Sequence, residues 1–478
     1  MLFNSIEFYV FFPVVTIGFF LLPHRFRWML LLAASCLFYM AFIPKYILIL
    51  AITIVVDFFV GLQLGRMEGR RKKAFLVLSI LCNVGFLFFF KYFNFFNTNL
   101  ASLAHFLHWN YPIENLSIIL PIGLSFHTFQ SMSYIIEVYK GQQEPERNFG
   151  LYALYVMFYP QLVAGPIERP YNLLNALHEE KTYDEARVAD GMRLMVWGMF
   201  KKVVIADNLA LIVDEVYNHP AGYKGLPILI ATYFFAFQIF CDFSGYTDIA
   251  RGAARVMGFH LMRNFDRPYL SKSISEFWKR WHISLSSWFR DYVYIPLGGS
   301  RAGLWKTYRN TMVVFLLSGL WHGAKWTFVI WGGLNGVYLI ASMLTKDVRA
   351  GFYRKLPFLD RPWIRKYVGV GVTFHLICLS WIFFRANSTS DAFLLLRNLF
   401  GGLAFPRFQY RGAGFDMLLG FALIGFLLVV QLVQRRHRIG DMLKRRSVLV
   451  SWAACGAGVL AIVLLGVTKA NMFIYFQF

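Results

Sequence analysis

Long runs of apolar residues recur along nearly the whole chain, and only short polar segments separate them. A helix needs about 20 mostly apolar residues to cross a bilayer. The runs that approach this length cover residues 5–22, 28–44, 46–65, 74–92, 116–138, 148–166, 226–250, 311–345, 367–385, 415–434 and 447–468, with a weaker candidate at 190–212. The pattern predicts an all-α polytopic membrane protein with about 11–12 transmembrane helices. No soluble domain interrupts the series, so we expect residues 1–478 to form a single integral-membrane domain.

Two segments depart from the pattern of simple spanning helices. A polar turn at residues 321–326 interrupts the run 311–345, and such a turn is tolerated at membrane depth only where it is buried in protein or lines a watered cavity. We therefore expect a re-entrant pair of arms, about 311–320 and 325–345, with His322 in a cavity inside the membrane. In residues 272–292, apolar and aromatic side chains recur at spacings of three and four, which predicts an amphipathic helix lying on or dipping into the inner interface.

Composition and charge exclude a soluble globule and orient the chain. Hydrophobic residues make up 58% of the sequence and charged residues 15%, whereas soluble chains have roughly 45–50% and 25%. The 48 Lys and Arg exceed the 26 Asp and Glu and give a net charge of +22, as expected where basic residues mark cytoplasmic loops. The basic loops 66–73 and 435–446 then place both termini outside, and the final span with its aromatic tail, 447–478, ends there. The basic segment 251–310 would lie inside, where it can attract an acidic ligand.

Polar side chains within the apolar runs are the candidate functional residues, because they are costly in a bilayer. His322 is the first of them, since an imidazole titrates close to neutral pH and can take a proton from a hydroxyl and return it to a leaving group. His282 either lies at the interface or lines the approach to the same cavity. His127 is explained more simply by a hydrogen bond between helices. The five cysteines are far apart and include no C-x-x-C pair, which argues against a metal site or a disulfide framework.

Two further groups each keep two interpretations open. Gln238 and Asp242 are four residues apart on one helical face, and Asp242 either pairs with an arginine or lines a ligand path. The tail 473–478 is almost entirely aromatic. It either forms an aromatic belt at the outer interface or inserts the Tyr475 hydroxyl into a site. The sequence has no P-loop, G-x-G-x-x-G, H-E-x-x-H or G-x-S-x-G motif, which argues against an ATP-driven pump, a dinucleotide enzyme, a zinc protease and an α/β hydrolase.

Five blocks of sequence resemble the membrane-bound O-acyltransferase family, and within it the alginate O-acetyltransferase branch. They are LPIGLSFHTFQSMSYIIEVYKG at 120–141, VAGPIERP at 163–170, FCDFSGYTDIARG at 240–252, EFWKRWHISLSSWFRDYVYIPLGGSR at 276–301 and SGLWHGAKWTFVIWGGLNG at 318–336. The resemblance implies the fold of that family, with its core motifs in residues 116–345. The essential histidine of the family's W-H-G block corresponds to His322, and that of its R-W-H-I-S block to His282. The segment Phe473-Ile474-Tyr475-Phe476 is similar to the F-x-Y-F ending of a small partner protein in the related D-alanyl transfer system.

The resemblance also implies the activity. It indicates an enzyme of the bacterial cytoplasmic (inner) membrane that takes an acetyl group from acetyl-CoA, a co-substrate used without a bound cofactor, and passes it across the bilayer. A periplasmic or membrane-anchored partner of the SGNH-like type would then place it on a cell-surface polysaccharide such as alginate or peptidoglycan. No nucleic acid is involved.

Residue pattern and resemblance together give the predicted site. We expect His322, His282 and Tyr475 to be catalytic, with His322 as general base and Tyr475 as a transient acetyl carrier. The predicted substrate-binding residues are Trp321, Lys325, Asp242, Gln238, Arg290 and His127. The alternative function is a secondary transporter, which polar residues inside the membrane would also suit, or a scaffold of a polysaccharide export complex. The sequence shows no repeat symmetry of the kind found in many carriers.

Overall fold

The computed structural model describes residues 1–117, 120–301, 303–356, 358, 360–402, 408, 412–434, 448–467 and 473–474. The regular elements of these ranges are all helices, as predicted. Six helical stretches in the described ranges are long and apolar enough to cross a membrane: Pro44–Leu64, Gly69–Phe106, Leu226–Met257, Trp326–Leu344, Pro362–Arg385 and Ala413–Val433. Ile6–Leu21 and Ala453–Leu465 are shorter apolar helices. The basic loop predicted at 435–446 lies outside the described residues.

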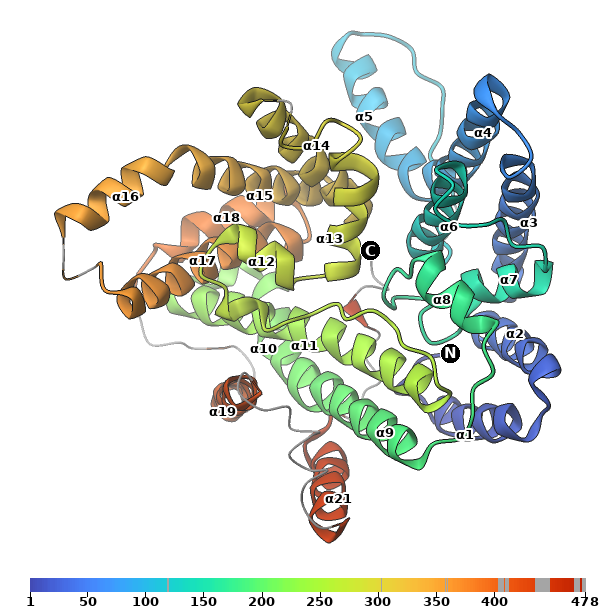
Figure 1. Ribbon diagram of the computed structural model, residues 1–478. Helices are drawn as coiled ribbons and strands as arrows, with labels where there is room; N and C mark the ends of the chain where they lie inside the picture. The colour runs from blue at the N-terminus through green and yellow to red at the C-terminus, as the bar shows by residue number, and fades with distance from the viewer. Residues whose placement is uncertain are drawn as a thin grey trace. The chain divides into compact units, whose positions relative to one another are not determined.

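Figure 1 shows the arrangement of the helices, which follow one another along the described chain. In chain order the α-helices are α1 (Ile6–Leu21), α2 (His24–Met40), α3 (Ile47–Leu64), α4 (Gly69–Leu87), α5 (Phe93–Phe106), α6 (Leu124–Tyr139), α7 (Phe149–Met157), α8 (Pro170–Leu177), α9 (Glu185–Met199), α10 (Asp207–Asn218), α11 (Leu226–Val256), α12 (Ile274–Arg280), α13 (Ile283–Phe289), α14 (Leu304–His322), α15 (Trp326–Leu344), α16 (Lys346–Lys355), α17 (Pro362–Arg385), α18 (Thr389–Leu399), α19 (Ala413–Val433) and α21 (Val448–Leu465). The short 3₁₀ or π turns are η1 (Pro44–Tyr46), η2 (Phe88–Tyr92), η3 (Phe200–Ala206), η4 (Pro220–Gly222), η5 (Pro268–Leu270) and η6 (Arg290–Tyr294).

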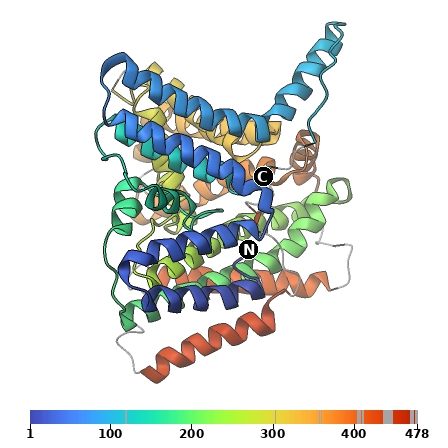
Figure 2. The same ribbon diagram turned by 90° about the vertical axis from the view of Figure 1, so that its right-hand side faces the viewer.

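Several of the predicted spans differ from the observed helices, among them the runs 148–166 and 74–92. The run 148–166 forms only the nine-residue helix α7, after which the chain turns at Pro160, so it is too short to cross a bilayer as a helix. The run 74–92 belongs instead to a longer helical stretch, because α4 continues through the π turn η2 into α5. Figure 2 shows this stretch changing direction between α4 and α5, which is what a π-bulge does to a helix.

The first of two compact units contains residues Met1–Met195 and Tyr246–Met262. Helices α3, α4 and α6 pack against one another in it (Figure 1). Asp57 of α3 is fully buried there and accepts hydrogen bonds from Ser79 Oγ at 2.6 Å and Asn83 Nδ2 at 2.9 Å, both on α4. Glu168, which follows α7, is also buried. It accepts from the Met262 backbone N–H at 2.5 Å, and its burial raises the pKa of the carboxyl to about 7.

The second compact unit contains Val196–Gly245 and Arg263–Ile474. Its central feature is the hairpin of α14 and α15, against which α12 and α17 pack. The two arms of the hairpin touch through Gly319 and Gly332, where an added Cβ would collide with the backbone of the opposite helix. The predicted pair of arms is therefore confirmed as a helical hairpin with its turn at residues 323–325, although its first arm begins earlier, at Leu304.

The weak candidate at 190–212 is one continuous helical stretch rather than an apolar span. Helix α9 runs through the π turn η3 into α10 without a break. The stretch carries Lys201 and Lys202 side by side, and both are buried.

Candidate functional site

The hairpin turn presents His322 at the last position of α14. The side chain is 4% exposed and lies among aromatic rings from neighbouring helices. Its ring centroid is 5.0 Å from that of Trp331 on α15 and 5.2 Å from that of Phe384 on α17. Trp321, the preceding residue, is equally buried, at a centroid separation of 4.9 Å. The polar imidazole is thus held inside the protein by the α14–α15 pair and by α17.

His282 lies at a break between two short helices. The predicted amphipathic helix 272–292 is interrupted here, because α12 ends at Arg280 and His282 adopts the left-handed conformation, with φ of +43°. Asn264 accepts hydrogen bonds at this break, through its backbone carbonyl from the Ile283 N–H at 2.9 Å and through its side chain from the Ser284 N–H at 3.2 Å. Asn264 therefore caps α13 and replaces the intrahelical partners that its first N–H groups lack.

The break aims His282 toward His322. The two ring centroids are 6.5 Å apart, and the His282 ring lies perpendicular to that of Phe243 of α11, at a centroid separation of 4.7 Å. Both histidines are buried, with His282 1% exposed. Because the two ring centroids are only 6.5 Å apart, a reacting group that contacted one histidine would be within reach of the other.

The aromatic stripe of 272–292 faces protein rather than a membrane surface. Trp278 packs edge-on against Trp331 at 5.7 Å, and Trp281 lies 5.1 Å from Trp381, which in turn stacks on Trp331 at 5.8 Å. The predicted helix is divided into α12 and α13, and its apolar face packs against protein, since spacings of three and four report one buried face and do not say what covers it. The stripe builds an apolar wall around the two histidines, where water is excluded and electrostatic effects are strengthened.

Comparison with known proteins assigns this arrangement to a family. Residues 147–386 match the sequence profile of the membrane-bound O-acyltransferase family. The chain is 37% identical over 408 residues to the probable alginate O-acetylase AlgI of Pseudomonas aeruginosa, an alignment that covers 84% of this chain and 75% of the relative. The chain belongs to the membrane-bound O-acyltransferase family.

Other relatives have related activities. The chain is 34% identical to the peptidoglycan O-acetyltransferase of Helicobacter pylori, with 84% of this chain and 80% of the relative covered. It is 29% identical to the teichoic acid D-alanyltransferase of Bacillus subtilis, with 58% and 70% covered. The prediction of a membrane-bound acyltransferase, rather than a transporter or a scaffold, is thereby confirmed.

The other predicted site residues of this O-acyltransferase are dispersed. Lys325 and Arg290 are exposed, and Arg290 pairs with its neighbour Asp291 at 2.8 Å. His127 is buried in α6 of the first unit. Gln238 is buried in α11 of the second unit, and its side-chain oxygen meets no hydrogen-bond donor among the described residues. Tyr475 lies outside the described residues, so its predicted role stays a prediction.

Asp242 belongs to a charged cluster that the sequence did not reveal. It was expected to pair with an arginine or to line a ligand path, but its Oδ1 lies 2.8 Å from the ammonium of Lys202. Lys202 also reaches Asp207 at 2.8 Å, and all three side chains are at most 5% exposed. The signal that could have found this cluster was the pair Lys201-Lys202 inside a largely apolar stretch, since such charges need partners.

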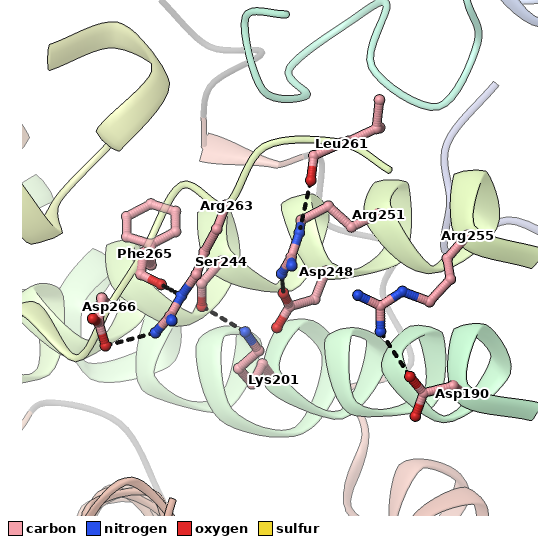
Figure 3. Close-up of polar contacts among 10 residues, drawn as sticks. All are labelled: Asp190, Lys201, Ser244, Asp248, Arg251, Arg255, Leu261, Arg263, Phe265 and Asp266. Atoms are coloured by element: carbon pink, nitrogen blue, oxygen red, sulfur yellow. Dashed lines mark hydrogen bonds and ion pairs between the residues drawn. The ribbon is translucent and has the colours of Figure 1, made fainter. Parts of the chain in front are cut away.

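Acidic partners also neutralise much of the basic segment that begins at Arg251. Figure 3 shows Arg255 reaching Asp190 of α9, at 2.9 Å, and Arg251 reaching Asp248 one helical turn earlier, at 3.2 Å. It also shows Arg263 beside Asp266, at 2.6 Å. These arginines therefore form ion pairs within the protein. The remaining basic residues of 251–310 would have to attract an anion.

Proposed function

We propose that this protein moves acetyl groups from cytoplasmic acetyl-CoA across the cytoplasmic membrane for O-acetylation of a cell-surface polysaccharide. The observation that carries the proposal is the His282–His322 pair inside its aromatic wall. Relatives named for alginate and peptidoglycan acetylation support a glycan as the final acceptor. Which of these glycans receives the group would be decided by an outer partner protein of the SGNH-like type.

His322 would act as the general base of the transfer. Its imidazole takes the proton of an attacking hydroxyl as the oxygen forms a bond to the thioester carbonyl. The tetrahedral adduct then collapses, the carbon–sulfur bond breaks, and the imidazolium returns the proton to the CoA thiolate. His282 lies close enough to orient the reacting group or to stabilise the developing charge. The apolar wall keeps water from hydrolysing the thioester.

The attacking hydroxyl would be that of Tyr475. The tail hydrogen bond from the Ile474 N–H to Asp242 supports this choice, because Phe243, next to Asp242, contacts His282. The resulting tyrosyl ester would pass its acetyl group to the outer partner. The orientation predicted from the basic loops, with both termini outside and the donor at the inner face, supports this direction.

Acetyl-CoA turnover by the purified protein, with a soluble acceptor, tests the proposal. We expect release of CoA by the wild type and a loss of about 10²–10⁴-fold in His322→Gln. Mass spectrometry of enzyme trapped with acetyl-CoA should find an acetyl group on the peptide that contains Tyr475. Normal transfer by Tyr475→Phe would eliminate the relay and leave direct activation of an acceptor hydroxyl by His322. Deletion in the source bacterium would then identify the glycan that loses its acetyl esters.

A further inference from the structure

The second unit buries a cluster of three charged side chains that takes no part in the proposed chemistry. Lys202 Nζ lies 2.8 Å from Asp207 Oδ1 and 2.8 Å from Asp242 Oδ1. Taking such charges out of water costs several kcal/mol per ion unless each is compensated. Lys202 contacts Asp242 through Oδ1, so Asp242 Oδ2 can accept a further N–H group.

The fold forces Lys202 toward Asp242 by bringing two helices unusually close. Lys202 lies in the π turn η3, a local widening of the helix that is frequent at functional sites. Opposite it, Gly245 of α11 is packed so tightly that an added Cβ would lie 2.7 Å from the Gly198 carbonyl oxygen and 3.2 Å from the Lys202 nitrogen. Asp242, one helical turn before Gly245, is thereby brought within reach of the ammonium.

The remaining capacity of the cluster is used by the tail. The backbone N–H of Ile474 donates to Asp242 Oδ2 at 2.8 Å, and the Phe473 ring lies 4.8 Å from Lys202 Nζ, within the range of a cation–π contact. Phe473 and Ile474 are both buried. Upstream, the chain is held to the same helical stretch, because Asn208 Nδ2 donates to the Leu465 carbonyl at 2.8 Å.

We propose that Lys202, Asp207 and Asp242 form an anchor for the tail and position Tyr475 for acetyl transfer. The inference rests on the proposed function, since Tyr475 is the acetyl carrier there. Ile474 is the residue before Tyr475, and consecutive Cα atoms are only about 3.8 Å apart. Anchoring Ile474 on α11 therefore fixes the chain immediately before Tyr475, at Asp242, whose neighbour Phe243 contacts His282. The three anchor residues touch no reacting atom and act as positioning residues.

Hydrogen–deuterium exchange in lipid nanodiscs measures how strongly the anchor protects the Ile474 N–H, and it does not depend on enzyme activity. Asp242→Ala removes the acceptor of the Ile474 N–H but leaves Lys202 paired with Asp207, so the buried cation keeps a partner. We expect the peptide that contains Ile474 to exchange about tenfold faster in this variant, as for the loss of one hydrogen bond to a charged group. The matched control is Asp57→Ala, which removes an equally buried carboxylate from α3 in the other unit and should leave this peptide unchanged.

The rate of acetyl transfer tests whether the anchor positions Tyr475. We expect Asp242→Ala to lower kcat by about 10²-fold, the scale of a misplacement of about 1 Å, with little change in the KM for acetyl-CoA. Ile474→Pro removes the donor N–H and leaves Lys202, Asp207 and Asp242 intact, so it should also lower kcat. Unchanged exchange in Asp242→Ala overturns the anchor, and faster exchange with normal kcat overturns its positioning role. Normal transfer by Tyr475→Phe with a protected Ile474 overturns the relay alone.

Discussion

Replacing Gly245 by alanine tests the close approach of α11 to the helical stretch of α9 and η3. The new Cβ would lie 2.7 Å from the Gly198 carbonyl oxygen and 3.2 Å from the Lys202 nitrogen, whereas ordinary contacts begin at 3.4 Å. Both neighbours are backbone atoms, which no side-chain rotation can move away. The two helices must therefore separate by about 0.7 Å, which stretches the 2.8 Å contact between Lys202 and Asp242.

Gly425 supplies a control, because the same Gly→Ala change is expected to stabilise the protein there. Overpacking of this kind costs about 1–3 kcal/mol. Gly425 of α19 is exposed and an added Cβ there meets no atom within 4 Å, so Gly425→Ala should gain about 0.8–1 kcal/mol from helix propensity alone. Both glycines lie inside helices and share the gain from helix propensity, so the two substitutions are expected to differ by the cost of overpacking, about 1–3 kcal/mol.

Thermal unfolding in detergent, followed by tryptophan fluorescence, compares the two variants. Gly245→Ala should melt below the wild type and Gly425→Ala at or above it. Acetyl-CoA turnover at a temperature where both are folded should fall only in Gly245→Ala, because Asp242 and the tail that it holds are displaced. A Gly245→Ala protein that is as stable and as active as Gly425→Ala would refute the argument that this contact sets the position of Asp242.

Three further predictions concern other positions. His322→Gln should remove acetyl-CoA turnover by about 10²–10⁴-fold while leaving the melting temperature within a few degrees, as a circular-dichroism melt can check. Asn264→Ala removes the side-chain cap of α13 and should cost about 0.5–2 kcal/mol of stability; turnover should fall as well, since His282 sits at that break. Because the pKa of Glu168 is raised to about 7, its burial costs nothing below the unfolded value near 4.5 and progressively more as pH rises to 7. The wild type should therefore lose about 3 kcal/mol of stability between pH 4.5 and pH 7 relative to Glu168→Gln, measured as paired melting curves.

The sequence predicted the hairpin and its histidine because both follow from local rules. An apolar run too long for one span and interrupted by Trp321-His322-Gly323 has few ways to satisfy its backbone in a membrane. The observed turn falls within the predicted residues, and the two arms are α14 and α15. What the sequence could not give was the set of rings around His322. Trp331 and Phe384 come from different helices, and their meeting depends on how those helices pack.

The break at His282 was missed for a different reason. Periodicity in 272–292 is continuous across it, because buried apolar residues recur at a spacing of three in both helices, as Ile274 and Phe277 in α12 and as Leu285 and Trp288 in α13. The interruption depends on Asn264, which caps α13 from outside that segment. Local periodicity cannot report a partner that is distant in sequence, and the same limit applied to Asp242, whose lysine partner is forty residues earlier in the chain.

The charged anchor has a physical property that an apolar contact would lack. Buried ion pairs contribute little net stability, and an apolar cluster of similar volume would often hold the same helices at least as well. A buried carboxylate, however, makes loss of its hydrogen-bond donor costly in free energy. If the Ile474 N–H moved away, Asp242 Oδ2 would lose this donor in a buried site. An unsatisfied buried acceptor costs about 1–3 kcal/mol, and more when it is charged. The cluster therefore links the packing of η3 against α11 to the binding of Ile474. Correct folding of this unit fixes the position of Ile474.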